Sequence, residues 1–207
     1  ATLATSGTDD ASLYDSQALI IAGANIGGDL TLSGAASIGQ TGAIHAATLD
    51  VTTTSGAITL TNAGNSFGPA TVSTSGSDDA SLYDSSDLTV ASANVGGTLT
   101  LSSGGAIGQT GAIHAAALNA ATTPGAIVLT NSGNNFGTLT LSTSGTDDAS
   151  IFDATNLIVA SANIGGDLAL SVDGSLGQTG AIHAASLNAT TTGGAINLTN
   201  AGNSFAI

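Results

Sequence analysis

Three acidic clusters contain the residues of this sequence whose types and spacing best suit chemistry. Each cluster has two adjacent aspartates and a third aspartate five positions later, in segments rich in Gly and Ser. Three carboxylates this close together can supply the oxygen ligands that Ca²⁺ prefers. Calcium is therefore the one metal ion that we consider, with nine candidate ligands: Asp9, Asp10, Asp15, Asp78, Asp79, Asp84, Asp147, Asp148 and Asp153.

The same clusters have two other interpretations. Two carboxylates flanking a sugar bond perform the acid–base chemistry of glycosidases, and Asp10 with Asp15, or Asp78 with Asp84, would form such a pair. The sequence has no Lys, Arg or Trp to hold a substrate, so we expect no enzyme. The second interpretation is a solvated turn in which the first Asp accepts local backbone N–H bonds. Because the cluster appears once per sequence repeat rather than in every rung of a solenoid, we expect the solvated turn and no required cofactor.

Three histidines are the other candidates for chemistry, and each stands in an identical nonapeptide, GQTGAIHAA. A metal site needs ligands that converge on one point, whereas His45, His114 and His183 are a full repeat apart and have no Cys or Glu nearby. We expect the glycines to bracket a tight corner, the Ile to enter the core and the His to point outward by strand alternation. The histidines are therefore predicted to be structural.

The composition excludes several function classes. The chain has no Lys or Arg and a formal net charge of −14, and all its acidic residues are Asp. Nucleic-acid binding requires cations that neutralise phosphates, so nucleic acid is excluded as a partner. Membrane insertion is excluded as well, because a spanning helix needs about 20 consecutive apolar residues. The best helix formers Glu, Lys, Arg and Met are absent, so we expect strands built from Val, Ile, Leu and Thr.

The chain consists of three copies of one 69-residue unit, 1–69, 70–138 and 139–207, without gaps. Within a copy, apolar residues alternate with Thr or Ser over about five positions, as in Leu30 and Leu32, and Gly- or Asn-rich turns separate these runs. No helical period interrupts them. The fold class is therefore all-β, with the three copies forming a single continuous domain.

Two all-β architectures fit this pattern, a series of β-sandwich domains and a β-solenoid. The chain has only six aromatic residues, four Phe and two Tyr, which suits the narrow interior of a solenoid better than a sandwich core. We predict a right-handed parallel β-helix with about three rungs per repeat and about nine rungs in total. Residues at one corner are expected to be buried, Asn65, Asn134 and Asn203 as a polar stack and Phe67, Phe136 and Phe205 as interior plugs.

Several phrases resemble a known family. AITLTNAGNSFG (57–68), GAIGQTGAIHA (105–115) and ANIGGDLALS (162–171) resemble the repeat regions of large secreted bacterial exoproteins of the filamentous-haemagglutinin type. The resemblance implies a right-handed parallel β-helix, secretion to the bacterial cell surface and a role as a surface fibre or adhesin stalk.

The expected function is that of a structural segment in an extracellular fibre. The chain begins and ends within its pattern and shows no polar cap or signal peptide, so we expect uncapped ends that stack on further copies of the chain or on further repeats. The alternative is a binding module, with a calcium-stapled or carbohydrate-binding face. Ice binding by ranks of outward Thr is less favoured, because Asp50, Asn119 and Asn188 interrupt those ranks.

Overall fold

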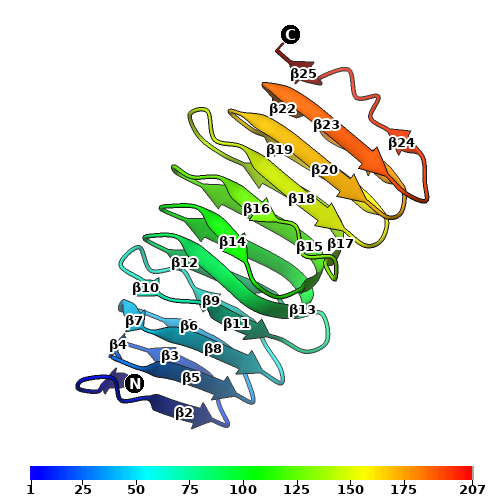
Figure 1. Cartoon of the computed structure of the whole chain (residues 1–207). Coiled ribbons are helices and arrows are strands. Elements are labelled where there is room, and N and C mark those ends of the chain that lie inside the picture. The colour runs from blue at the N-terminus through cyan, green and yellow to red at the C-terminus, as the bar shows by residue number, and fades with distance from the viewer. Residues whose placement is uncertain (207) are drawn as a thin grey trace.

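The computed structural model describes residues 1–206, which form a rod of stacked parallel strands with the two chain ends at opposite ends of the rod (Figure 1). The described residues contain no helix, and hence none long and apolar enough to cross a membrane. The first repeat contains ten short strands: β1 (Thr2–Ala4), β2 (Ala11–Asp15), β3 (Leu19–Ile21), β4 (Gly23–Asn25), β5 (Asp29–Gly34), β6 (Ile38–Gln40), β7 (Ile44–Ala46), β8 (Thr48–Thr53), β9 (Ile58–Leu60) and β10 (Ser66–Phe67).

The later repeats follow the same plan, but neighbouring strands merge across some corners. The longest strand covers three of the ten strand positions, and three others cover two each. The strands are β11 (Ala70–Ser73), β12 (Ala80–Asp84), β13 (Leu88–Ser103), β14 (Ile107–Gln109), β15 (Ile113–Thr122), β16 (Ile127–Leu129), β17 (Asn135–Ser142), β18 (Ala149–Asp153), β19 (Leu157–Asn163), β20 (Asp167–Val172), β21 (Leu176–Gln178), β22 (Ile182–Ala184), β23 (Ser186–Thr191), β24 (Ile196–Asn197) and β25 (Ser204–Phe205).

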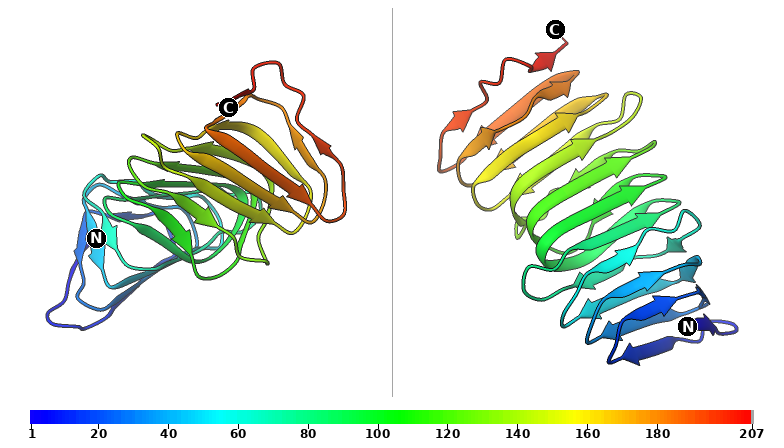
Figure 2. Two further views of the ribbon diagram at one scale, coloured as in Figure 1. Left: turned by 45° about the horizontal axis from the view of Figure 1, so that its top comes forward. Right: turned by 180° about the vertical axis from the view of Figure 1, so that it is seen from behind.

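Strands pair with the third strand position after them in the chain, for example β1 with β4. Each turn of the solenoid therefore has three faces (Figure 2). Face 1 starts with β1, β4, β7 and β10, which form a sheet of their own. Beyond a break in the strand pairing it consists of residues 88–90, β14, β16, β18, β20 and β23. Face 2 starts with β2, β5, β8 and β11. Face 3 starts with β3, β6, β9 and β12.

One turn of the solenoid is shorter than a third of a repeat. In the strand register Leu19 pairs with Ile38, Ile38 with Ile58 and Ile58 with Ala80. Ala80 thus lies three turns above Leu19, whereas the counterpart of Leu19 in the next repeat is Leu88, which comes later in the chain and lies on another face. A repeat of ten strand positions with three per turn makes three and one third turns.

The parallel β-solenoid is confirmed, with about ten turns in place of the predicted nine. The extra third of a turn means that successive repeats are rotated by one face about the rod axis. Equivalent residues of the three repeats therefore lie on three different faces, and the full set of ten strand positions returns to its starting face only after three repeats.

The core is formed by the alternation that the sequence shows. Along β5 the side chains of Leu30 and Leu32 are fully buried, and the register places Leu49 and Val51 of β8 directly above them. Because parallel neighbours are about 4.8 Å apart, each inward side chain packs on its counterpart in the next turn. The outward positions of the same strands carry Thr, Ser and Asp, so every rung buries one side and solvates the other.

Candidate functional site: the polar corner and the acidic turns

Each repeat contains one polar corner in which a Gln of one turn and an Asn of the next bond to each other. In the second repeat, the Nε2 atom of Gln109 donates to Oδ1 of Asn134 at 2.8 Å, and Nδ2 of Asn134 donates to Oε1 of Gln109 at 2.8 Å. The same pair recurs as Gln40 with Asn65 and as Gln178 with Asn203. The Gln of each GQTG motif is thus half of a reciprocal amide pair.

The Asn of this corner also replaces missing backbone partners. Asn134 is fully buried, accepts a bond from the N–H of Ile113 at 2.9 Å and donates to the carbonyls of Leu129 at 3.1 Å and Phe152 at 3.2 Å. One amide group therefore joins three successive turns. Buried polar groups are costly unless they are bonded, and among residues 1–206 no buried side-chain nitrogen or oxygen lacks a partner.

The prediction of a buried Asn with an adjacent Phe plug is confirmed in the first two repeats. The expected stack of Asn65, Asn134 and Asn203 at one corner is wrong, because successive repeats are rotated by one face. Asn65, Asn134 and Phe136 have no exposed surface, and Phe67 is 5% exposed. In the last described turn, Phe205 is 38% exposed, because no further turn lies over it among residues 1–206. Burial of this corner therefore requires a turn on each side.

The glycines of the GQTG corner have unequal roles. A side chain at Gly111 would collide with the backbone carbonyl of Ala91 in the turn beneath, whereas a side chain at Gly108 would meet nothing. The second glycine is thus required by the close approach of two turns. The first is free to be replaced.

The histidines lie where strand alternation places them. His45, His114 and His183 are exposed, and the Ile before each is fully buried. They lie on faces 1, 2 and 3 respectively, in β7, β15 and β22. The rotation of the repeats separates them around the rod as well as along it.

The acidic clusters divide into exposed and buried carboxylates. The middle Asp of each cluster is exposed and accepts a backbone hydrogen bond from the next turn. Oδ1 of Asp79 accepts the N–H of Thr98 at 2.7 Å, and Asp10 and Asp148 accept equivalent bonds. The first Asp holds the preceding turn in the later clusters, where Asp78 Oδ2 accepts the N–H of Gly56 at 2.7 Å. These carboxylates bond to backbone of adjacent turns, a longer range than the local turn that the sequence predicted.

The third Asp of the cluster becomes a core residue in the second and third repeats. Asp84 and Asp153 are fully buried, with carboxylates that accept the N–H of Phe67 at 2.8 Å and of Phe136 at 2.7 Å. The second oxygen of Asp153 accepts both the N–H and the hydroxyl of Thr155. Asp15, in the first turn, is half-buried, and within residues 1–206 its carboxylate accepts one bond, from the N–H of Gln17. The buried carboxylate substitutes for a carbonyl of the strand ladder at the polar corner.

The nine calcium candidates are not gathered into a cage. No group of three or more His, Asp, Glu or Cys side chains in the described part of the chain is placed to hold a metal ion. The three clusters themselves lie on different faces, in β2, β12 and β18. Calcium binding stays an alternative, and a direct measurement is needed to test it.

The outward Thr ranks follow the strand register, so their interruptions can be located. On face 2, Asp50 lies between Thr31 and Thr71, and on face 3, Asn119 lies between Thr100 and Thr140. An ice-binding surface needs an unbroken flat rank. The register thus gives no support to the ice-binding alternative.

The sequence did not predict the reciprocal Gln–Asn pair, although the GQTG motif and the Asn were both singled out. The two members are 25 residues apart, a spacing that is one turn plus one corner. The identical Gln and Asn in all three repeats were the only sequence signal for this pair. That the two side chains are close can be deduced only when the length of a turn is known. The polar corner therefore has a structural role, because its Gln and Asn side chains use their polar atoms to bond to other parts of the chain.

Comparison with known proteins gives one family and no individual relative. The model of a family described as repeats of unknown function (DUF5649) matches residues 8–74, 77–143 and 146–207. The starting positions of the three matches have the same spacing as the sequence repeats. No curated protein and no solved structure matches the chain. Since the three matches cover most of its length, the chain belongs to the family of repeats of unknown function DUF5649 and is a repeat β-solenoid structural protein.

Proposed function

We propose that the chain is a rod segment of an extracellular bacterial surface fibre or adhesin stalk, lengthened through its ends by further repeats or by further copies of itself. The observation that carries the proposal is the way in which the three repeats of the chain stack on one another. At each junction two faces continue as strand ladders and a buried Asp carboxylate bridges the third, so adding a repeat lengthens the rod without a change of fold.

The junction between repeats 1 and 2 is held by specific polar contacts. The N–H of Ile58 donates to the carbonyl of Asp79 at 3.0 Å, and the N–H of Phe67 donates to the Asp84 carboxylate. The junction between repeats 2 and 3 repeats these contacts, with Ile127 donating to Asp148 at 3.0 Å and Phe136 to Asp153. The corresponding donors of repeat 3 are Ile196 and Phe205, and the corresponding acceptors of repeat 1 are Asp10 and Asp15. The two ends of the rod are thus complementary.

Burial supports further stacking in the same way. Ile196 is 45% exposed, whereas its counterpart Ile127 is fully buried, and Phe205 is 38% exposed against 0% for Phe136. Covering these side chains with another turn removes apolar surface from water, which stabilises the stack by about 25 cal/mol per Å². The contact joins unlike ends of the rod, so it is head-to-tail and does not close.

The rotation of the repeats favours a stalk over a one-sided binding surface. Each face passes through all ten strand types in three repeats, so all sides of the rod have the same average chemistry. Three repeats make ten whole turns, so a stacked copy needs no rotation by a face. With about 4.8 Å per turn, each unit would add about 48 Å to the rod.

The extracellular location has compositional support. A chain without Lys and Arg has no cleavage site for trypsin-type proteases, and a chain without Cys needs no particular redox compartment. We propose no catalytic role, because three of the four carboxylates suited to acid–base chemistry, Asp10, Asp78 and Asp84, accept backbone bonds that join the turns. Antibody labelling of intact cells of the source organism tests the location: labelling only after permeabilisation contradicts it.

A direct fusion of two 207-residue units tests the stacking geometry. The second unit follows Ile207 without a linker, and small-angle X-ray scattering measures length and cross-section. We expect one rod with an unchanged cross-section and about 48 Å of added length. A matched fusion with a long, flexible Gly-Ser linker supplies the profile of two separate units. A direct fusion that scatters like the linked control would refute the proposal.

A further inference from the structure

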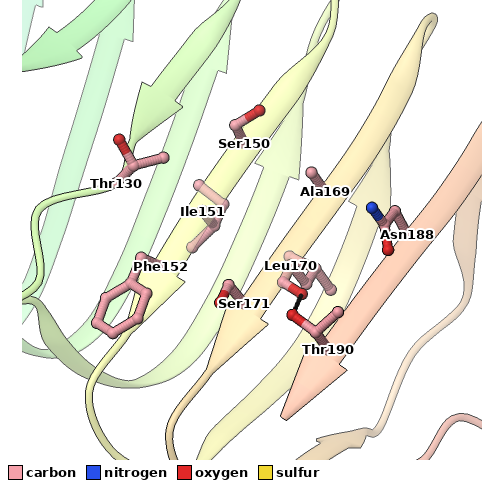
Figure 3. A pocket seen from close by; sticks show the side chains of 9 residues that line it. All are labelled: Thr130, Ser150, Ile151, Phe152, Ala169, Leu170, Ser171, Asn188 and Thr190. Atoms are coloured by element: carbon pink, nitrogen blue, oxygen red, sulfur yellow. Dashed lines mark hydrogen bonds between the residues drawn. The ribbon is translucent and has the colours of Figure 1, made fainter. Parts of the chain in front are cut away.

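A shallow hollow of about 300 Å³ lies on face 1 in the third repeat (Figure 3). Three adjacent strands, β18, β20 and β23, each contribute two outward side chains to the hollow, and Thr130, which follows β16 in the second repeat, borders it as well. Its volume is at the low end of the roughly 300–1,000 Å³ that small-molecule sites span. The six side chains are Ser150, Phe152, Ala169, Ser171, Asn188 and Thr190.

The strand register explains the hollow. Ala169 lies between Ser150 and Asn188 in the same rank across the three strands, so a single methyl group forms the floor between larger neighbours. In the adjacent rank Phe152 stands beside Ser171, and its ring turns away from Ala169 toward the Thr130 side, where it forms an aromatic wall at one end of the hollow (Figure 3). The floor and the wall are thus apolar, and the rest of the rim carries hydroxyl and amide groups.

The other two repeats have different residues at the positions that form the floor and the wall of the hollow. At the floor, repeats 1 and 2 have Thr31 and Thr100 where repeat 3 has Ala169. At the wall, they have Tyr14 and Tyr83 where repeat 3 has Phe152. Both differences remove a hydroxyl group, and both fall on the same hollow. Repeat 3 therefore has an apolar centre at a place where its sister repeats are polar.

The chemistry of the lining selects the class of ligand. No charged side chain lines the hollow, and the chain has no Lys or Arg and a net charge of −14, so anions are repelled and a cation has no carboxylate partner. Asn188 and Thr190 are exposed at the rim. A neutral ring with an apolar face and a hydroxylated edge matches this arrangement, because aromatic side chains pack on apolar surface while rim groups bond to hydroxyls.

We propose that this hollow, which we call the repeat-3 hollow, binds one neutral hexopyranose unit of a glycan. The C–H face of the sugar packs over Ala169, and the ring of Phe152 bounds one end of the hollow. Its hydroxyls bond to the amide of Asn188 and to the hydroxyls of Ser171 and Thr190, although the Thr190 hydroxyl also donates to the Leu170 carbonyl at 3.5 Å. β23 is the last strand of face 1 among the described residues, so β1 of a stacked copy would lie beside the Asn188 and Thr190 rim.

The test is an immobilised array of neutral hexose and N-acetylhexosamine oligosaccharides, with uronic-acid and sulfated glycans as the charged comparison. The 207-residue chain is applied first, and Kd for any bound glycan is then measured by calorimetry. We expect binding to at least one neutral glycan and none to charged ones. Binding to charged glycans alone, or to no glycan at millimolar concentration, overturns the proposal.

Two exchanges between repeats make the test specific. Ala169→Thr fills the hollow with the residue of the sister repeats and should weaken binding at least about tenfold, as expected when a fitted pocket loses the space of a small group. Thr100→Ala opens the same floor in repeat 2 and should raise the stoichiometry of binding. Thr59→Ala, outside the hollow on face 3, is the control, and thermal melts verify folding of each variant. Unchanged affinity in Ala169→Thr would show that any glycan binds elsewhere.

Discussion

Replacement of Asn134 by Ala is the sharpest test of the polar corner. The substitution leaves three buried backbone groups without their partner: the N–H of Ile113 and the carbonyls of Leu129 and Phe152. Each unsatisfied buried group costs about 1–3 kcal/mol, and a water in the vacated space recovers part of that loss. We therefore expect the free energy of unfolding to fall by about 3–5 kcal/mol.

The chain supplies its own controls for this substitution. Asn203→Ala removes the same amide in the last described turn, where the side chain is half-buried and bonds to Gln178, Leu198 and Ile182 only. Its cost should be smaller, about 1–2 kcal/mol. Asn135→Ala changes an exposed neighbour and should cost less than about 1 kcal/mol.

Urea denaturation gives the free energies, and hydrogen exchange gives a local signal. The amide of Ile113 should exchange much faster in Asn134→Ala than in the parent chain, because its acceptor is the removed side chain. Equal losses for Asn134→Ala and Asn203→Ala, or unchanged protection of Ile113, would refute the assignment of the corner as a link between turns.

Three further predictions concern the corner and the acidic clusters. Gly111→Ala should lower stability by about 1–3 kcal/mol through the collision with the Ala91 carbonyl, and Gly108→Ala should stay within about 0.5 kcal/mol of the parent; equal effects in urea melts would contradict the close-approach argument. Asp153→Ala should cost about 2–4 kcal/mol, because its buried carboxylate accepts three bonds, and Asp15→Ala less than about 1 kcal/mol; a reversed order in the same melts would disprove the role of the carboxylate as a ladder substitute. Calcium at millimolar concentration should leave the melting temperature as it is in EDTA, and a calcium-dependent rise would identify a site that the carboxylate positions do not explain.

Much of the architecture follows from the sequence, because alternation specifies which side chains are buried. Leu30 and Leu32 point inward, each Ile before a His is buried and the His itself is outward. The signal is local, and it does not depend on where the turns begin. The all-β solenoid with an aliphatic core could thus be predicted before any pairing was known.

The number of turns could not be predicted in this way. Strands of three residues, such as β4, β6 and β7, are too short to show an alternation that distinguishes them from corners. When they are missed, the ten strand positions of a repeat are undercounted, and the repeat is divided into three whole turns. Because the ten strand positions of a repeat do not divide evenly among three faces, His45, His114 and His183 lie on separate faces.

The roles of the carboxylates were also beyond local reasoning. The sequence predicted that the first Asp of a cluster bonds within its own turn. In the structure Asp78 bonds to Gly56, which is 22 residues earlier, and Asp79 bonds to Thr98, which is 19 residues later. Those partners become neighbours only through the stacking of turns, and the burial of Asp84 and Asp153 follows from the same stacking.

Electron cryo-microscopy of the 207-residue chain, over a series of rising concentrations, tests the central claim most directly. We expect head-to-tail rods that lengthen with concentration, with strands about 4.8 Å apart along the axis and about 48 Å per unit. Equivalent repeats should be rotated by one third of a turn, and successive units should have no such rotation. Particles that remain single at every concentration would contradict stacking of copies, and repeats aligned on one face would contradict the ten-strand repeat.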